Sequence, residues 1–174
     1  ARSEKDEWTY EIIRTVFAAF GQEVRKYDPY RPLSTGDSVV RAGAWHNWTE
    51  KTWGPDTLEQ QIEMTIADNP APVDLISVHI YPSALPQLPM AVQAAQRMRK
   101  PLFVGEFGAP GPPDKSEAPF RELLKALEDQ GVPLAALWTF GGNQKDTYTV
   151  TVEGDRAYQL QSLTEANARL QATP

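Results

Sequence analysis

The chain has 174 residues, a formal net charge of -6 at pH 7 and no cysteine, which excludes thiol catalysis, disulfides and Cys-based zinc sites. Lys and Arg form no cluster, so we expect no nucleic-acid partner. Only two histidines are present, His46 and His79, and we therefore expect neither a multi-histidine metal centre nor a cofactor. No apolar run approaches the roughly 18 residues of a membrane span. The length suits one domain over residues 1–174.

Hydrophobic periodicity predicts a helix followed by four strand–helix pairs. The first helix covers 8–27, where apolar side chains recur every three or four residues. The strands are expected at 33–37, 74–82, 102–106 and 134–140, and the helices that follow them at 57–67, 88–99, 116–130 and 156–170. Asp56 and Glu59 have the spacing of a capping box, which marks the start of the helix over 57–67.

Nearly all-apolar strands that alternate with amphipathic helices are typical of a parallel sheet covered by helices. Four such units fit either half of an α/β barrel or a small doubly wound sheet. No glycine-rich phosphate-binding pattern follows any of the strands, so a nucleotide site has no support.

Two segments lack a clear helical period. The segment 41–53 is aromatic and is predicted to be an irregular loop; it contains Trp45, His46, Trp48 and Trp53. Such loops favour a ligand-facing surface, and the alternative is a loop folded over the barrel rim with its rings as a small core. The segment 144–155 fits either a long loop or a hairpin, because apolar side chains alternate there.

Polar and aromatic side chains gather where the strands end. In chain order the strand ends carry Asp37 and Ser38, His79 and Tyr81, Glu106, and Trp138 and Asn143. In both α/β architectures the carboxyl ends of the strands carry the functional residues. Taken alone, Glu106 fits a helix-capping role as well as a catalytic one. The agreement of four strand ends favours catalysis.

One carboxylate beside a histidine, a tyrosine and a tryptophan suits sugar chemistry. A retaining glycosidase needs a carboxylate nucleophile and a second carboxylic acid about 5–5.5 Å away. No other predicted strand ends in Glu, and Asp37 is a candidate for the second acid by position only. We expect Trp45 and His46 in the aromatic segment, and Asn143 after the last strand, to contact the substrate.

Three motifs resemble the sixth, seventh and eighth strands of the cellulase-like glycoside hydrolases, family five and its clan relatives. They are His79-Ile80-Tyr81-Pro82, Val104-Gly105-Glu106-Phe107-Gly108 and Leu137-Trp138-Thr139-Phe140. The resemblance implies a (β/α)8 TIM barrel of which this chain is the C-terminal half, strands five to eight with their helices. It also implies that Glu106 is the nucleophile, that His79 and Tyr81 assist it, and that Trp138 is a sugar platform.

The chain departs from that family at the acid/base residue. In the family this Glu follows an Asn at the end of the fourth strand, and the sequence contains no Asn-Glu pair. The resemblance therefore implies that the missing N-terminal half of the barrel is a partner of this chain. It also implies an extracellular or periplasmic location. The leading hypothesis is a retaining glycoside hydrolase acting on a β-linked glycan or glycoside. The alternative is a non-catalytic carbohydrate-binding or structural half-barrel that lacks the general acid.

Overall fold

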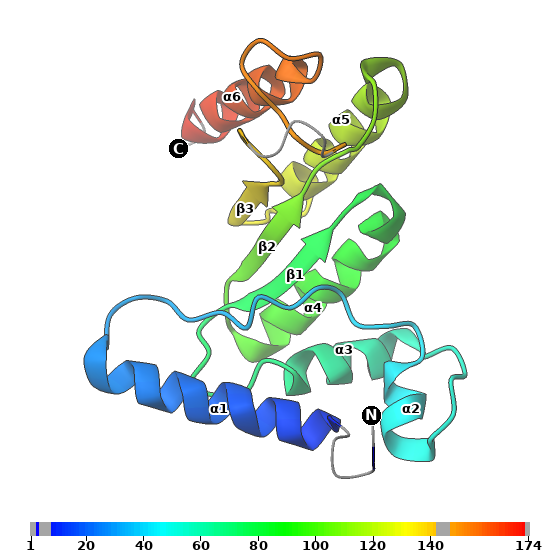
Figure 1. Cartoon of the computed structure of the whole chain (residues 1–174), viewed down its shortest axis with the longest axis vertical. Coiled ribbons are helices and arrows are strands. Elements are labelled where there is room, and N and C mark those ends of the chain that lie inside the picture. The colour runs from blue at the N-terminus through cyan, green and yellow to red at the C-terminus, as the bar shows by residue number, and fades with distance from the viewer. Residues whose placement is uncertain (1–2, 4–7, 142–146, 173–174) are drawn as a thin grey trace. The chain divides into compact units, whose positions relative to one another are not determined.

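The computed structural model describes residue 3 and residues 8–141 and 147–172, which form an α/β fold (Figure 1). Its elements are α1 (Tyr10–Tyr27), α2 (Ala44–Glu50), α3 (Leu58–Ala67), β1 (Ile76–Ile80), the 3-10 helix η2 (Pro82–Gln87), α4 (Leu88–Met98), β2 (Leu102–Phe107), α5 (Pro113–Asp129), β3 (Leu134–Leu137) and α6 (Ala157–Ala172). The strands form one parallel sheet in the order β1-β2-β3. The predicted α/β class is confirmed. Within the described part, none of the helices has the length and apolar character needed to cross a bilayer.

The chain divides into two compact units. The first comprises Ala1–Val78 and Pro89–Phe103, and the second comprises His79–Leu88 and Val104–Pro174. Strands β1 and β2 each begin in the first unit and end in the second. The carboxyl ends of the strands, where the sequence places its functional residues, therefore belong to the second unit.

Helices α3 and α4 build the core of the first unit. Ile62, Met90 and Ala94 are buried together, with Val40 and Ile66 packed against them. The capping box of α3 is formed by Thr57 and Gln60, one residue later than the predicted pair. Thr57 starts the helix because its hydroxyl accepts the Gln60 backbone N–H while the Gln60 side chain accepts the Thr57 N–H.

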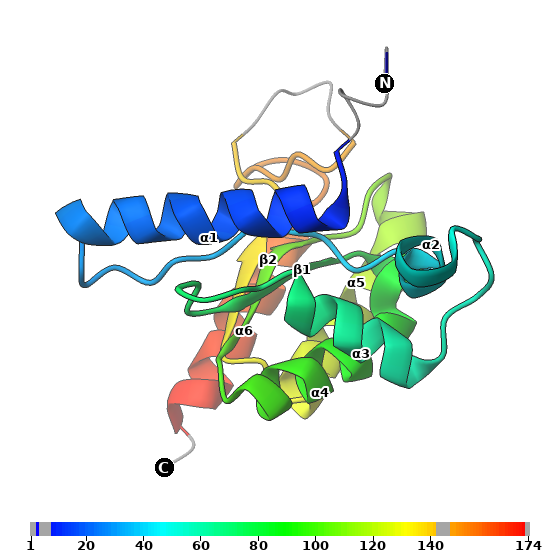
Figure 2. The same cartoon turned by 90° about the horizontal axis from the view of Figure 1, so that it is seen from below.

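Helix α1 forms where the apolar stripe predicts it, and Thr9 caps its start by accepting the Ile12 N–H. The stripe is only partly covered in the described part of the chain, since Phe20 is 66% and Tyr27 is 82% exposed. In Figure 2, α1 is seen along its length. Periodicity thus predicted the helix correctly, but it did not predict that part of the apolar face is exposed.

The strand predicted at 33–37 is wrong. Leu33 alone makes sheet-like contacts, through a carbonyl that accepts the backbone N–H groups of Asp74 and Leu75. Beyond it, the Ser34 and Thr35 hydroxyls accept the N–H groups of residues 36 and 37, and Gly36 has a positive φ of 74°. These local bonds compete with a strand ladder, so the segment is extended without being a strand.

The prediction of an irregular loop over 41–53 is also wrong, because residues 44–50 form α2. The helix starts after Gly43 without a side-chain cap of its own. Asp56 replaces the cap from further along the chain, since its carboxylate accepts the backbone N–H groups of Trp45 and His46. A carboxylate at a helix N-terminus also complements the helix dipole. The signal for α2 is therefore not local in the sequence.

The second unit is built on α5 and α6. Phe107 of β2 stacks on Phe120 of α5 with ring centroids 6.0 Å apart, and the Tyr158 ring of α6 meets Phe120 edge-on. Helix α5 begins at Pro113, three residues before its predicted start. Val150 pairs with Phe140 in a single parallel bridge, so the described part of the 144–155 segment forms a loop and not a hairpin.

We predict that Gly43→Ala destabilises the chain more than Gly54→Ala does. A Cβ atom at Gly43 would lie 2.7 Å from the Gly54 carbonyl oxygen and 3.1 Å from that of Trp53, both of them backbone atoms. At Gly54 the nearest atom would be a His46 ring carbon at an ordinary 3.5 Å. Overpacking of this kind costs about 1–3 kcal/mol. Urea unfolding followed by tryptophan fluorescence measures both variants, and equal midpoints would contradict the prediction.

Candidate active site

Glu106 lies near the end of β2 and meets two side chains from the end of β1. The Tyr81 hydroxyl donates a hydrogen bond of 2.7 Å to Glu106 Oε2. His79 Nδ1 lies 3.3 Å from the same oxygen. The Glu106 and His79 side chains are 24% and 21% exposed, so solvent still reaches them. The structure thus brings together all three residues that were predicted to be catalytic.

Strand geometry explains this convergence. His79 and Tyr81 are two residues apart in extended backbone and therefore point to one face. Tyr81 precedes Pro82, where η2 begins, so the tyrosine stands at the point where the strand stops. The Tyr148 ring packs edge-on against the Tyr81 ring, with centroids 5.1 Å apart. That contact restricts the tyrosine and so fixes the direction of its hydroxyl.

Trp138 follows β3 and is 42% exposed. Its backbone N–H donates to the Phe107 carbonyl at 2.8 Å, and a cis peptide bond joins it to Thr139. A Cβ atom at Gly108 would lie 2.6 Å from the Trp138 carbonyl oxygen. Glycine at position 108 is therefore what allows this backbone to approach the end of β2 so closely. An exposed indole beside a strand end suits the stacking of a sugar face.

The contacts of Glu106 are chemically one-sided. Tyr81 and His79 both contact Glu106 Oε2, and no described residue hydrogen-bonds to Glu106 Oε1. A donated hydrogen bond orients a carboxylate. Such a carboxylate can act as a nucleophile through its second oxygen. Among the described residues, no group of three or more His, Asp or Glu side chains is arranged to hold a metal ion.

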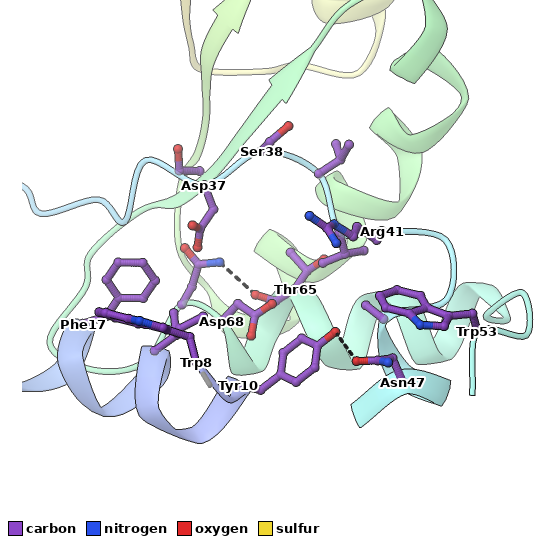
Figure 3. Close-up of a pocket in the computed structure, with 16 residues that line it drawn as sticks. Trp8, Tyr10, Phe17, Asp37, Ser38, Arg41, Asn47, Trp53, Thr65 and Asp68 are labelled. Atoms are coloured by element: carbon purple, nitrogen blue, oxygen red, sulfur yellow. Dashed lines mark hydrogen bonds between the residues drawn. The ribbon is translucent and has the colours of Figure 1, made fainter. Parts of the chain in front are cut away.

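The remaining predicted residues lie in the first unit or outside the described residues. Asp37 lines a cavity of about 530 Å³, shown in Figure 3. Trp45 donates its indole N–H to Glu63 at 2.8 Å, and His46 Nδ1 lies 2.7 Å from Asp56 Oδ1. Both side chains thus have partners within their own unit. Asn143 lies outside the described residues.

Two residues with important contacts were not predicted as such. Tyr148, which supports Tyr81, was considered only as part of an alternating segment. Asp56 was interpreted as part of a capping box for α3, whereas its fully buried side chain anchors α2. Burial raises the pKa of the Asp56 carboxyl, but the hydrogen bonds from His46 and from the backbone of residues 45 and 46 outweigh burial and hold that pKa below its ordinary value.

Comparison with known proteins gives a match in structure alone, since no protein-family model and no curated protein sequence matches the chain. The endo-1,4-beta-D-mannanase of Thermotoga petrophila RKU-1 superimposes with a TM-score of 0.61 at 15% identity, over 90% of this chain and 51% of the mannanase. The endo-1,4-beta-mannanase of Rhizomucor miehei gives 0.67 at 12% identity, over 95% and 48%. The glycoside hydrolase family 5 mannosidase of the same organism gives 0.63 at 12% identity, over 91% and 48%.

The chain shares the fold of part of these enzymes, of which the mannosidase belongs to glycoside hydrolase family 5. It spans about half the length of the solved structures that it matches. At 12–15% identity the likeness is one of fold. The resemblance read from the three motifs is thereby confirmed at the level of fold, and the roles of individual residues depend on the geometry described above.

We predict that Asp56→Asn destabilises the chain near pH 7 by about 1–3 kcal/mol, the range for leaving buried hydrogen-bonding groups without their partner. The folded pKa of Asp56 lies below the ordinary value. The ionised Asp56 carboxylate therefore stabilises the fold fully at any pH above the pKa that it has in the unfolded chain, about 4. That stabilisation is lost as the pH falls through the lower pKa of the folded state. Urea unfolding measured from pH 7 to pH 3 should show the variant and the parent converging in acid. Asp114→Asn, at an exposed site on α5, is the control, and a constant gap across this range would contradict the prediction.

Proposed function

We propose that this chain carries the nucleophile side of a retaining glycoside hydrolase that cleaves a β-linked glycan or glycoside. The observation that carries the proposal is the geometry of Glu106, which has one oxygen held by Tyr81 and His79 and the other without a described partner. The shared fold with family 5 glycoside hydrolases supports it. The proposal makes Glu106 the nucleophile, with Tyr81 and His79 as its positioning residues.

The chemistry follows from this arrangement. Glu106 Oε1 attacks the anomeric carbon, the bond from that carbon to the leaving oxygen breaks, and the leaving oxygen takes the electron pair and a proton. The glycosyl ester on Glu106 is then hydrolysed by water, so two inversions return the original configuration. Tyr81 keeps the carboxylate from rotating, and Trp138 offers a flat apolar surface to the sugar ring.

A second carboxylic acid must donate the proton to the leaving oxygen. Neither of the side chains that contact Glu106 in the described part of the chain, Tyr81 and His79, is a carboxylate. We assign this acid to the missing N-terminal half of the barrel, either in the same polypeptide or as a separate partner. Two observations support this: the chain spans about half of the matched enzymes, and apolar side chains such as Phe20 on α1 are exposed.

The matched structures indicate the substrate class to test first. They are mannanases and a mannosidase, so β-1,4-mannan and its oligosaccharides are the substrates that we propose for this chain. A non-catalytic carbohydrate-binding half-barrel is the competing function. It is favoured by the absence of a second carboxylate among the described residues that contact Glu106.

We predict that 2,4-dinitrophenyl 2-deoxy-2-fluoro-β-mannoside labels Glu106. Its leaving group departs as the phenolate and needs no proton, so the missing acid is not required, and the fluorine slows hydrolysis of the ester. The expected result is release of about one equivalent of dinitrophenolate and a glycosyl mass on the peptide that contains Glu106. Glu106→Gln should abolish both, and Glu117→Gln on the surface of α5 should change neither. Oligosaccharide binding without label would leave the non-catalytic function as the better account.

We predict that Tyr81→Phe slows labelling about 10- to 100-fold while the fold is retained. The variant keeps the ring that packs on Tyr148 and loses one hydrogen bond to a charged group, which is worth about 1.5–3 kcal/mol. Tyr158→Phe removes a comparable hydroxyl, which bonds to Ser116 at 2.7 Å elsewhere in the same unit. Labelling rates at saturating reagent compare the two variants. Equal rates for Tyr81→Phe and the parent would show that the hydroxyl does not position the nucleophile.

A further inference from the structure

Arg156 stands immediately before α6, at a position where its charge is unfavourable for the helix. Its carbonyl accepts the Gln159 N–H at 2.9 Å, so the residue belongs to the start of α6. A helix N-terminus carries a partial positive charge, which favours acidic or hydroxyl side chains there and disfavours a cation. A residue that breaks a local rule in this way usually serves a contact elsewhere. The partners of the guanidinium show what that contact is.

The Arg156 guanidinium bridges two segments that follow the strands of the candidate site. Its Nε–H donates to the Thr149 carbonyl at 3.0 Å, and an N–H of Nη2 donates to the same oxygen. An N–H of Nη1 donates to the carbonyl of Gly111, which follows β2, at 3.2 Å. The backbone N–H of Gly111 also donates to the Thr147 carbonyl at 3.2 Å. Arg156 therefore adds a second tie between the segment after β2 and residues 147–149.

The segment tied in this way carries Tyr148 and is held from two sides. On one side the Tyr148 carbonyl accepts the Thr139 N–H at a long 3.4 Å, and the Val150 N–H donates to the Thr139 carbonyl at 2.9 Å. The Thr149 carbonyl, between these two residues, bonds to Arg156. Thr149 is 7% exposed, so its carbonyl has little access to water that could replace the guanidinium. Loss of the arginine side chain would therefore favour a shift of this segment.

We propose that Arg156 is a positioning residue for Glu106, which acts through Tyr148 and Tyr81. By holding the Thr149 carbonyl it fixes the neighbouring Tyr148 ring, which packs edge-on against the Tyr81 ring with centroids 5.1 Å apart. Tyr81 in turn donates its 2.7 Å hydrogen bond to the carboxylate. The planar guanidinium suits this role because its N–H groups reach two oxygens at once, for which an ammonium has no matching fork. The inference rests on the proposed function, in which this carboxylate must be held for attack.

Labelling by the dinitrophenyl fluoromannoside tests the role of Arg156. Arg156→Ala should slow labelling about 3- to 30-fold, less than the loss of the Tyr81 hydroxyl itself, because the hydroxyl stays but is held less firmly. Arg156→Lys should fall between this variant and the parent, and it carries the test alone if Arg156→Ala does not fold. Arg121→Ala, at an exposed ion pair with Glu117 on α5, is the matched control and should label at the parental rate. A parental rate in Arg156→Lys would show that the charge suffices without the fork, and would overturn the proposal.

A double-variant comparison shows whether Arg156 acts through the Tyr81 hydroxyl. In a chain that already carries Tyr81→Phe, Arg156→Ala should slow labelling no further, because the group through which it acts is gone. Urea unfolding of each variant confirms that the labelled chain is folded. A double variant slowed by the product of the two separate effects would overturn the proposal.

The two histidines of the chain give a readout that does not depend on the reaction. His79 Nδ1 lies 3.3 Å from Glu106 Oε2 in the second unit, and His46 belongs to the first. Proton NMR of Arg156→Ala should show a shifted His79 ring resonance, because the carboxylate beside it moves, and an unshifted His46 resonance. A shifted His79 signal in a chain whose parent does not label would overturn the proposed function and leave the role of Arg156 standing. An unshifted His79 signal would overturn the role of Arg156, whether or not the parent labels.

Discussion

The register between β1 and β2 determines whether the three residues of the candidate site meet. Tyr81 and His79 come from the end of one strand and Glu106 from the next, so their contact at a single oxygen depends on how the strands align. The hydrogen bond from the Ile76 N–H to the Pro101 carbonyl, 3.0 Å long, fixes that alignment where the two strands start. A slip of one residue would turn His79 and Tyr81 to the opposite face of the sheet. The apolar side chains of both strands oppose such a slip, because Val78 and Val104 would then leave the core.

Backbone contacts then place Trp138 beside the end of β2 and Tyr148 beside Tyr81. The bond from Trp138 to the Phe107 carbonyl extends the sheet contact just beyond β3, and the absence of a side chain at Gly108 makes that approach possible. The loop that follows returns through Val150, whose N–H donates to the Thr139 carbonyl at 2.9 Å. This return brings Tyr148 against Tyr81. The orientation of the carboxylate therefore depends on a loop more than 40 residues further along the chain.

The sequence predicted those features whose signal is local or periodic. Apolar runs located β1, β2 and β3, and the two-residue spacing of His79 and Tyr81 placed both beside Glu106. The features that it missed depend on partners far away or on competing local bonds. Helix α2 is capped by Asp56, which lies beyond its C-terminal end, and the segment at 33–37 loses its strand character to the hydroxyls of Ser34 and Thr35. Tyr148 has no local signal, because its role arises from a tertiary contact.

The degree to which buried polar groups are satisfied separates structural residues from candidate functional ones. Asp56 accepts three hydrogen bonds through its two oxygens, and the Asn69 side chain both donates to the Thr65 carbonyl and lies 3.2 Å from the Thr35 hydroxyl. Groups satisfied in this way stabilise the fold and have little capacity left for a ligand. Glu106 Oε1 differs, since it has no hydrogen-bond partner in the described part of the chain and belongs to a side chain that is 24% exposed. An unbonded oxygen that solvent can reach keeps its capacity for a substrate, so Glu106 Oε1 marks the site proposed for this chain, and the buried unpartnered oxygens Ser77 Oγ, Gln87 Oε1 and Gln159 Oε1 do not.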